Sequence, residues 1–142
     1  MSKHETASSV VHGTGNFEVK SWDESPYNEV AGLPKLTRAN VTYSHQGVID
    51  GERISSSLMV YADDGSASFV SLDRVTGKIG DRSGSFVLQG SGTYSTADGI
   101  ARGTWFVVAG SGTGGLAGLR GEGGFVAGHQ PPGTITLDYY FE

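Results

Sequence analysis

Apolar and polar residues alternate along most of the chain, in stretches rich in Val, Ile, Phe, Tyr, Thr and Ser. Alternation with a period of two is typical of strands that have one buried and one exposed face. Eight such stretches occur, and they read VVHGTGNFEVKSW, LTRANVTYSHQGVI, RISSSLMVYA, SASFVSLDRVTGKI, SGSFVLQGSGTYS, IARGTWFVVA, LAGLRGEGGFVA and TITLDYYF. None has the apolar spacing of a helix of ordinary length, although residues 24–36 have room for a short helical turn. The pattern predicts an all-β protein.

Turn-forming residues separate these strands at regular intervals. They are Asp50-Gly51, Asp64-Gly65, Gly80-Asp81, Asp98-Gly99, the glycines of residues 112–115 and Pro131-Pro132-Gly133. Asp-Gly is a strong hairpin signal, and consecutive hairpins place strands side by side in chain order. An open meander of eight strands would leave two exposed edges, which closure into a barrel removes. We therefore expect residues 1–142 to form one eight-stranded antiparallel up-and-down barrel, with residues 1–8 flexible.

A glycine-rich segment raises the question of a nucleotide site. Residues 110–115 have the spacing G-x-G-x-x-G and follow the apolar run 105–109, as at the start of a dinucleotide-binding unit. That unit needs a helix after the glycines, but four more glycines occur between residues 118 and 124, and each costs a helix about 1 kcal/mol. The segment instead predicts a hairpin turn over 110–115, followed by a strand that bends or passes close to another backbone.

Composition excludes several classes of function. The chain has 23 glycines but no cysteine, so disulfides and thiolate metal sites are excluded. Its net charge is −5 and its ten Lys and Arg residues are scattered, so no nucleic-acid partner is expected. The four histidines lie at no metal-ligand spacing, and the first residues have no apolar stretch of signal or membrane-span length. We expect a cytoplasmic protein with no membrane partner, no metal and no cofactor.

The glycine-rich hairpin also carries a family resemblance. GSGTGGLAGLRGEG resembles the hairpin near the end of the allene oxide cyclase and dirigent barrels, whose pattern is roughly G-G-T-G-x-F-x-G-A-x-G. FVSLDRVTGKIGDRSGSFVLQ and the closing TLDYYF are similar to an uncharacterised bacterial domain family with the same cyclase-like fold. The likeness covers residues 13–141.

This resemblance implies an allene oxide cyclase-like barrel with a mostly apolar cavity, assembled as a dimer or trimer. In the plant enzymes the cavity folds a reactive lipid for cyclisation, and in dirigent proteins it governs the stereochemistry of radical coupling. Two positions depart from the bacterial family's pattern. Gly90 stands where that family often has histidine, and Asp73 stands where it usually has glutamate.

Strand alternation predicts which residues face the barrel interior. The inward set is Phe17, Val19, Val41, Tyr43, His45, Phe69, Ser71, Asp73, Phe86, Leu88, Trp105, Val107, Leu137, Tyr139 and Phe141. The third strand stays open, because Met59 with Tyr61 and Leu58 with Val60 are equally apolar. An eight-stranded barrel is just wide enough to be filled by side chains or to hold one small ligand.

Asp73 is the leading candidate for chemistry. Beside apolar neighbours its carboxyl would be partly desolvated and could act as an acid or base near neutral pH. The alternative is a position at the rim, paired with Arg74, Arg53 or Lys78. His45 lies two strands away, about 10 Å between backbones, so a direct contact with Asp73 is not expected.

The leading hypothesis is a cofactor-independent barrel that binds a small apolar molecule, polyketide- or lipid-like, and cyclises or isomerises it. Its candidate catalytic residues are Asp73, His45 and Tyr43, and its candidate substrate-binding residues are Phe69, Phe86, Trp105, Tyr139 and Tyr61. Conformational restriction by the aromatic residues and proton transfer by the catalytic set would provide the mechanism. The alternatives are a non-catalytic carrier or sensor and an oligomeric scaffold with a filled barrel.

Overall fold

The computed structural model describes residues 9–142, so residues 1–8, for which flexibility is expected, lie outside the described part. It confirms the predicted fold class: eight strands close into one antiparallel barrel in chain order. The strands are β1 (Val11–Asn28), β2 (Leu36–Gly47), β3 (Asp50–Tyr61), β4 (Ala67–Ile79), β5 (Arg82–Ser95), β6 (Ile100–Val107), β7 (Leu119–Ala127) and β8 (Gly133–Phe141). In the described part, no helix is long and apolar enough to cross a membrane.

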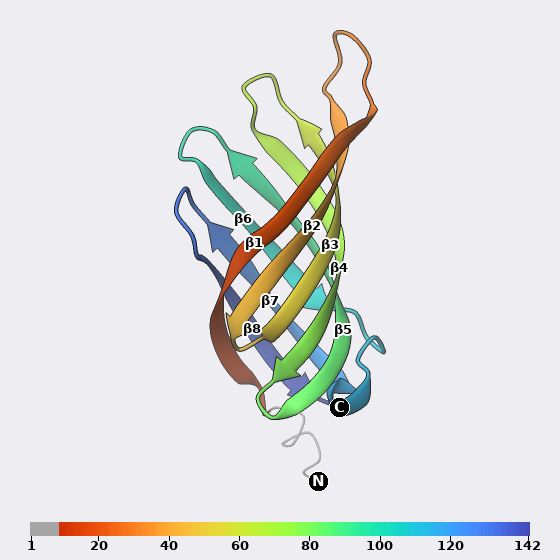
Figure 1. The fold of residues 1–142 in the computed structure, drawn as a ribbon, viewed down its shortest axis with the longest axis vertical. Helices are drawn as coiled ribbons and strands as arrows, with labels where there is room; N and C mark the ends of the chain where they lie inside the picture. The colour runs from red at the N-terminus through yellow and green to blue at the C-terminus, as the bar shows by residue number, and fades with distance from the viewer. Residues whose placement is uncertain (1–8) are drawn as a thin grey trace.

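The barrel has two unlike ends (Figure 1). At the end drawn uppermost lie the β1–β2, β3–β4, β5–β6 and β7–β8 turns, and β1 and β2 extend beyond the rest. The C-terminus and the three other connections lie at the opposite end. We call these the upper and lower ends.

The lower end is filled by apolar side chains. Ile49 comes from the β2–β3 turn, and Ile79, Phe86, Leu88 and Leu137 come from the strands. Leu116 and Leu119, at the end of the β6–β7 connection, are also fully or almost fully buried. This apolar plug leaves space for a ligand only in the upper part of the barrel.

Three local expectations need correction. Residues 110–115 form no tight hairpin: the β6–β7 connection spans residues 108–118 and contains a 3-10 turn, η1 (Gly114–Leu116), which places Leu116 in the plug. Asp50-Gly51 lies within β3, because the β2–β3 turn falls at residues 48–49. Residues 24–36 hold no helix, because β1 continues to Asn28 and the only turn here is the β1–β2 connection, where the Leu33 N–H donates to the Val30 carbonyl at 3.0 Å.

The expected close backbone approach does occur in β7. A Cβ atom on Gly123 would overlap the carbonyl group of Thr136 on β8. Glycine is therefore required at this position by contact between two strands.

Strand β1 changes partners along its length. From Val11 to Phe17 it pairs with β8, and beyond Phe17 it pairs with β2 alone among the described strands. A register irregularity between Val19 and Ser21 marks this change. Charged residues and Pro26 follow along the free edge, and such residues protect an edge strand from pairing with other chains.

Candidate functional site

A cavity of about 320 Å³ occupies the upper half of the barrel, above the plug. Its lining comes from seven strands and the β3–β4 turn: Phe17, Val19, Trp22, Tyr43, Arg53, Ser55, Ser57, Met59, Tyr61, Gly65, Ala67, Phe69, Ser71, Asp73, Gly90, Tyr94, Ala101, Trp105, Phe125 and Ala127. Met59 and Tyr61 line it while Leu58 and Val60 are exposed, which settles the faces of β3.

The cavity has two chemically different walls. On the β3 and β4 side the hydroxyls of Ser55, Ser57 and Ser71 line it. On the other side Trp105 and Phe125 are tilted against each other with ring centroids 5.5 Å apart. The ring of Phe69 comes from β4 and stacks on Phe125 at 6.1 Å, so it joins this aromatic wall from the serine side.

A buried arginine lies at the base of the cavity. Arg53 of β3 donates from Nε to His45 Nε2 at 2.9 Å and from Nη1 to Asp73 Oδ2 at 2.7 Å. Because β3 lies between β2 and β4, the arginine bridges the gap that separates His45 from Asp73. Exposed fractions of 4% for Arg53 and 2% for each partner show that all three groups are removed from solvent.

Aromatic rings surround the Arg53 guanidinium. Its carbon lies 3.8 Å from the ring centroid of Tyr43, 5.1 Å from that of Trp105 and 5.5 Å from that of Phe17. Cation–π attraction of this kind is worth about 2 kcal/mol when the cation is desolvated. The rings and Asp73 together compensate for removing the positive charge from water.

His45 is a neutral acceptor in this network. Burial, followed by the nearby positive charge of Arg53, lowers the pKa of His45 from 6.5 to about 3. Its Nε2 accepts the Arg53 hydrogen bond, so its proton is on Nδ1. That Nδ1 and the Oδ1 of Asp73 have no hydrogen-bond partner among the described residues. Each such unpaired buried group costs about 1–3 kcal/mol.

Tyr43 supplies a phenol that stays protonated. Burial raises the pKa of Tyr43, the Arg53 charge opposes that rise, and the net direction is upward from 10. At neutral pH its hydroxyl is therefore both a hydrogen-bond donor and an acceptor.

A second polar cluster lies at the upper end. Glu24 of β1 accepts hydrogen bonds from Tyr61 and Trp22, at 2.5 and 2.9 Å, and from the Thr37 hydroxyl at 2.6 Å. Burial and the Glu24 contact raise the pKa of Tyr61 to about 12. Burial alone would raise the pKa of Glu24, but the hydrogen bonds from Thr37, Tyr61 and Trp22 outweigh it and lower that pKa. This cluster ties β1 to β2 and β3 where β1 has left β8.

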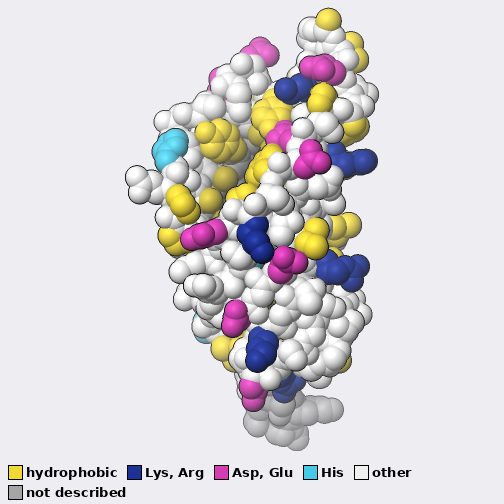
Figure 2. Space-filling model, in the orientation of Figure 1, with side chains coloured by type: hydrophobic (Ala, Val, Ile, Leu, Met, Phe, Trp, Pro, Cys, Tyr) yellow, Lys and Arg dark blue, Asp and Glu magenta, His cyan; other side chains and the backbone are white. Residues whose placement is uncertain are grey.

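The cavity reaches the surface beside β1. Val19 and Trp22 line the cavity and are each half exposed. On the face viewed in Figure 2, hydrophobic side chains gather in the upper half beside β1, where Figure 1 shows β1 diverging from the β7–β8 hairpin. At this place the cavity is bordered by side chains and not by hydrogen-bonded strand backbone.

The structure brings together most of the residues that the sequence nominates. Tyr43, Asp73, Phe69, Trp105 and Tyr61 all line the cavity. His45 lies behind Arg53 and touches the cavity only through it. Asp73 is in the interior and not at the rim, and its partner is Arg53.

Phe86 and Tyr139 need correction as cavity residues. Phe86 is part of the buried plug, and Tyr139 packs against that plug with its ring edge to Phe141 at 6.1 Å. Alternation predicts the face of a strand correctly here, but it carries no information on height along the barrel axis.

Sequence reasoning misses Arg53 and Phe125 as cavity residues. Arg53 shares its face with Met59 and Tyr61, so a decision on the face of β3 would have placed it inside. Phe125 follows glycines in β7, and only the small Ala127 lies two residues away to mark its face. Within residues 9–142, no group of three or more His, Cys, Asp or Glu side chains could hold a metal ion.

Comparison with known proteins gives a family but no activity. A family model described as a protein of unknown function, DUF3224, matches residues 13–139. Among solved structures, a protein with unknown function from the DUF3224 family of Shewanella oneidensis is 29% identical, with a TM-score of 0.78. The match covers 94% of this chain and 98% of that one. No curated protein matches.

Proposed function

Because the DUF3224 family, to which the chain belongs, is described without an activity, we propose a function from the cavity itself. The barrel binds one small, flat, largely apolar molecule that carries hydroxyl or carbonyl groups along one edge. The observation that carries this proposal is the two-sided lining. An aromatic wall of Trp105 and Phe125, which the Phe69 ring joins from β4, faces the serine hydroxyls of β3 and β4.

Cavity size and shape support a small ligand. At about 320 Å³ the cavity is at the lower end of ligand pockets. Aromatic rings favour flat, conjugated partners, with which they stack in offset or edge-to-face geometry. The ligand is therefore smaller than a long-chain lipid and close to a compact aromatic or polyene metabolite.

The charges at the base favour a neutral polar group over a carboxylate. Asp73 already balances the positive charge of Arg53 at 2.7 Å, so an anionic ligand would bring an uncompensated charge into a desolvated site. A neutral hydroxyl or carbonyl avoids that cost and finds donors and acceptors in Tyr43 and the serines.

Binding can be measured with 2-naphthol, which has a flat apolar body and one edge hydroxyl, and with naphthalene, which lacks the hydroxyl. We expect 2-naphthol to bind one molecule per barrel, tenfold or more tightly than naphthalene, and to change the fluorescence of the cavity residues Trp22 and Trp105. Ser71→Leu fills the cavity and should abolish binding, whereas Ser68→Leu, an exposed position on the same strand, should not. Equal binding to both serine variants would rule out the cavity as the site.

A second candidate is that the barrel cyclises or isomerises its ligand without a cofactor. Supporting it are the aromatic wall, which would restrict a flexible polyene or polyketide to few conformations, and the resemblance to allene oxide cyclase-like barrels. Asp73 and Tyr43 are the groups beside the cavity that could pass a proton to and from a ligand.

This candidate is tested by incubating the protein with polyene or polyketide precursors and analysing products by mass spectrometry. We expect the wild-type protein to change the product distribution. Asp73→Asn should retain 2-naphthol binding and lose that change. An unchanged distribution with the wild-type protein, together with intact 2-naphthol binding, would leave the carrier or sensor function in place of catalysis.

A further inference from the structure

The outer face of β3 to β6 carries large apolar side chains that point away from the barrel. Val70 and Leu72 on β4 are 55% and 57% exposed, and Phe106 on β6 is 47% exposed. Together with Leu58 on β3 they line a broad groove on the outside of the sheet. Contiguous exposed apolar surface of this kind is typical of an interaction site in a protein of this size.

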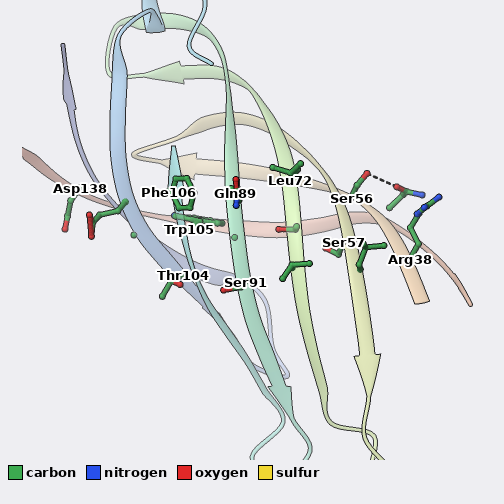
Figure 3. A pocket seen from close by; sticks show the side chains of 17 residues that line it. Arg38, Ser56, Ser57, Leu72, Gln89, Ser91, Thr104, Trp105, Phe106 and Asp138 are labelled. Atoms are coloured by element: carbon green, nitrogen blue, oxygen red, sulfur yellow. Dashed lines mark hydrogen bonds between the residues drawn. The ribbon is translucent and has the colours of Figure 1, made fainter. Parts of the chain in front are cut away.

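Strand register arranges the groove as two parallel rows. One row is Asn40, Ser56, Leu72, Gln89, Phe106, Glu122 and Asp138, and the other is Arg38, Leu58, Val70, Ser91 and Thr104. Figure 3 shows Phe106, Gln89, Leu72 and Ser56 in line across neighbouring strands, with Asp138 and Arg38 at opposite sides of the view. The rows therefore run across the strands, from β2 toward β8.

The two ends of these rows have opposite charge. Arg38 of β2 lies at one end, and Glu122 of β7 and Asp138 of β8 lie at the other. Asp138 pairs with His12 at 2.9 Å, but neither Arg38 nor Glu122 forms an ion pair with any residue in 9–142. These two rows thus have an apolar centre, with a cation at one end and an anion at the other that form no ion pair among the described residues. The Arg38 guanidinium lies over the ring of Tyr27, 6.0 Å from its centroid.

We propose that this face binds a second copy of the chain, in a dimer with a twofold axis parallel to the strands and between β4 and β5. That axis places the apolar centres against each other and brings Arg38 of each copy to the Glu122 end of the other. A surface that is positive on one side and negative on the other is complementary to itself under this rotation. Nucleic acid or an anionic membrane would instead require cations at both ends.

The face reaches the lower size limit of a specific interface, which is roughly 1,000 Å² in total or about 500 Å² per partner. Each outward residue of a sheet covers roughly 33 Å², because strands lie about 4.8 Å apart and outward residues recur about every 6.8 Å. Two flanking rows, which begin at Ile54 and Val60 and include the exposed Arg74 and Arg102, add to the two rows of the groove. Over β3 to β6 the four rows together cover roughly 500 Å².

The test is the molar mass of the full chain by light scattering during size-exclusion chromatography at about 50 μM. We expect twice the chain mass of 14.8 kDa for the wild-type protein. Leu72→Glu and Phe106→Glu should each give a monomer that retains the wild-type circular dichroism spectrum. A wild-type monomer, or a trimer or larger assembly, would overturn the twofold dimer.

Charge exchange tests the orientation of the two copies. Arg38→Glu and Glu122→Arg should each weaken the dimer tenfold or more, because each places like charges together. The double variant with both substitutions should recover the wild-type dissociation constant, whereas Lys20→Glu on the free part of β1 should leave it unchanged. A double variant as weak as the single ones would show that these two residues do not meet. This inference is independent of ligand binding, so it stands or fails separately from the proposed function.

Discussion

The Nε–H of Arg53 donates a hydrogen bond to Nε2 of His45, 2.9 Å away inside the barrel. An arginine is always a donor, so this contact requires a neutral histidine whose proton is on the other nitrogen. Burial and the Arg53 charge act in the same direction and lower the pKa of His45 to about 3. His45 is therefore a fixed acceptor that orients Arg53, and it is not an acid at neutral pH.

The state of His45 predicts how stability depends on pH. In the unfolded chain histidine takes up a proton near pH 6.5, whereas in the folded barrel His45 does so only near pH 3. The unfolded state therefore binds more protons between these values, and stability falls as the pH drops below about 6.5, by up to about 1.4 kcal/mol per pH unit.

Urea unfolding of the wild-type protein and of His45→Gln between pH 8 and pH 5 measures this contribution. The difference in unfolding free energy between the two proteins should be constant above pH 7 and should shrink as the pH falls to 5. A difference that does not change over this range would show that His45 takes up its proton at the same pH in the folded barrel as in the unfolded chain.

A second prediction concerns the buried ion pair. Arg53→Met removes the cation and leaves Asp73 buried without its partner, which typically costs about 3–5 kcal/mol. Combining it with Asp73→Leu removes both charges, and the double variant should be more stable than Arg53→Met alone. Unfolding free energies of the two single variants and the double variant give the coupling. Additive effects would mean that the Asp73–Arg53 contact at 2.7 Å contributes nothing specific.

Arg53 also shows where sequence reasoning reaches its limit. Alternation identified the inner faces of β2 and β5 because their outer faces are mostly polar. It also identified those of β4 and β6, although Val70, Leu72 and Phe106 point outward there. On β3 the outward Leu58 and Val60 are as apolar as the inward Met59 and Tyr61, so hydrophobicity alone leaves the face undecided. Of these two outward residues, Leu58 also lines the external groove.

The other feature that alternation does not predict is the position of a residue along the barrel axis. Phe86 and Tyr139 face inward as expected, but they lie in the plug and not in the cavity. Their height depends on strand register and on how far the β6–β7 connection reaches across the lower end. That connection places Leu116 in the plug through a 3-10 turn, which no local pattern in a glycine-rich segment indicates.

A third prediction tests the close approach of β7 and β8. In Gly123→Ala the added methyl group would overlap the backbone carbonyl of Thr136, and a backbone cannot move aside as a flexible side chain can. We expect destabilisation of about 1–3 kcal/mol, as for other overpacked positions. Gly128→Ala is a matched control, because a Cβ there meets no atom within 4 Å, and it should change stability by less than about 0.5 kcal/mol. Equal effects of the two substitutions would contradict the register of this strand pair.

The last prediction concerns how a ligand reaches the cavity, and it depends on the proposed binding function. β1 leaves β8 after Phe17, and Trp22 then lines the cavity while half exposed. A side chain at such a border must move when a ligand passes, so its removal should speed both entry and exit. Trp22→Ala should raise the association and dissociation rates of 2-naphthol several-fold, with a smaller change in affinity. Tyr27→Ala, on the same strand but outside the cavity lining, should leave both rates unchanged. Stopped-flow fluorescence follows these rates, from Trp22 and Trp105 in the wild-type protein and from Trp105 alone in Trp22→Ala. Wild-type rates in Trp22→Ala would place the entrance at the ring of turns on the upper end instead.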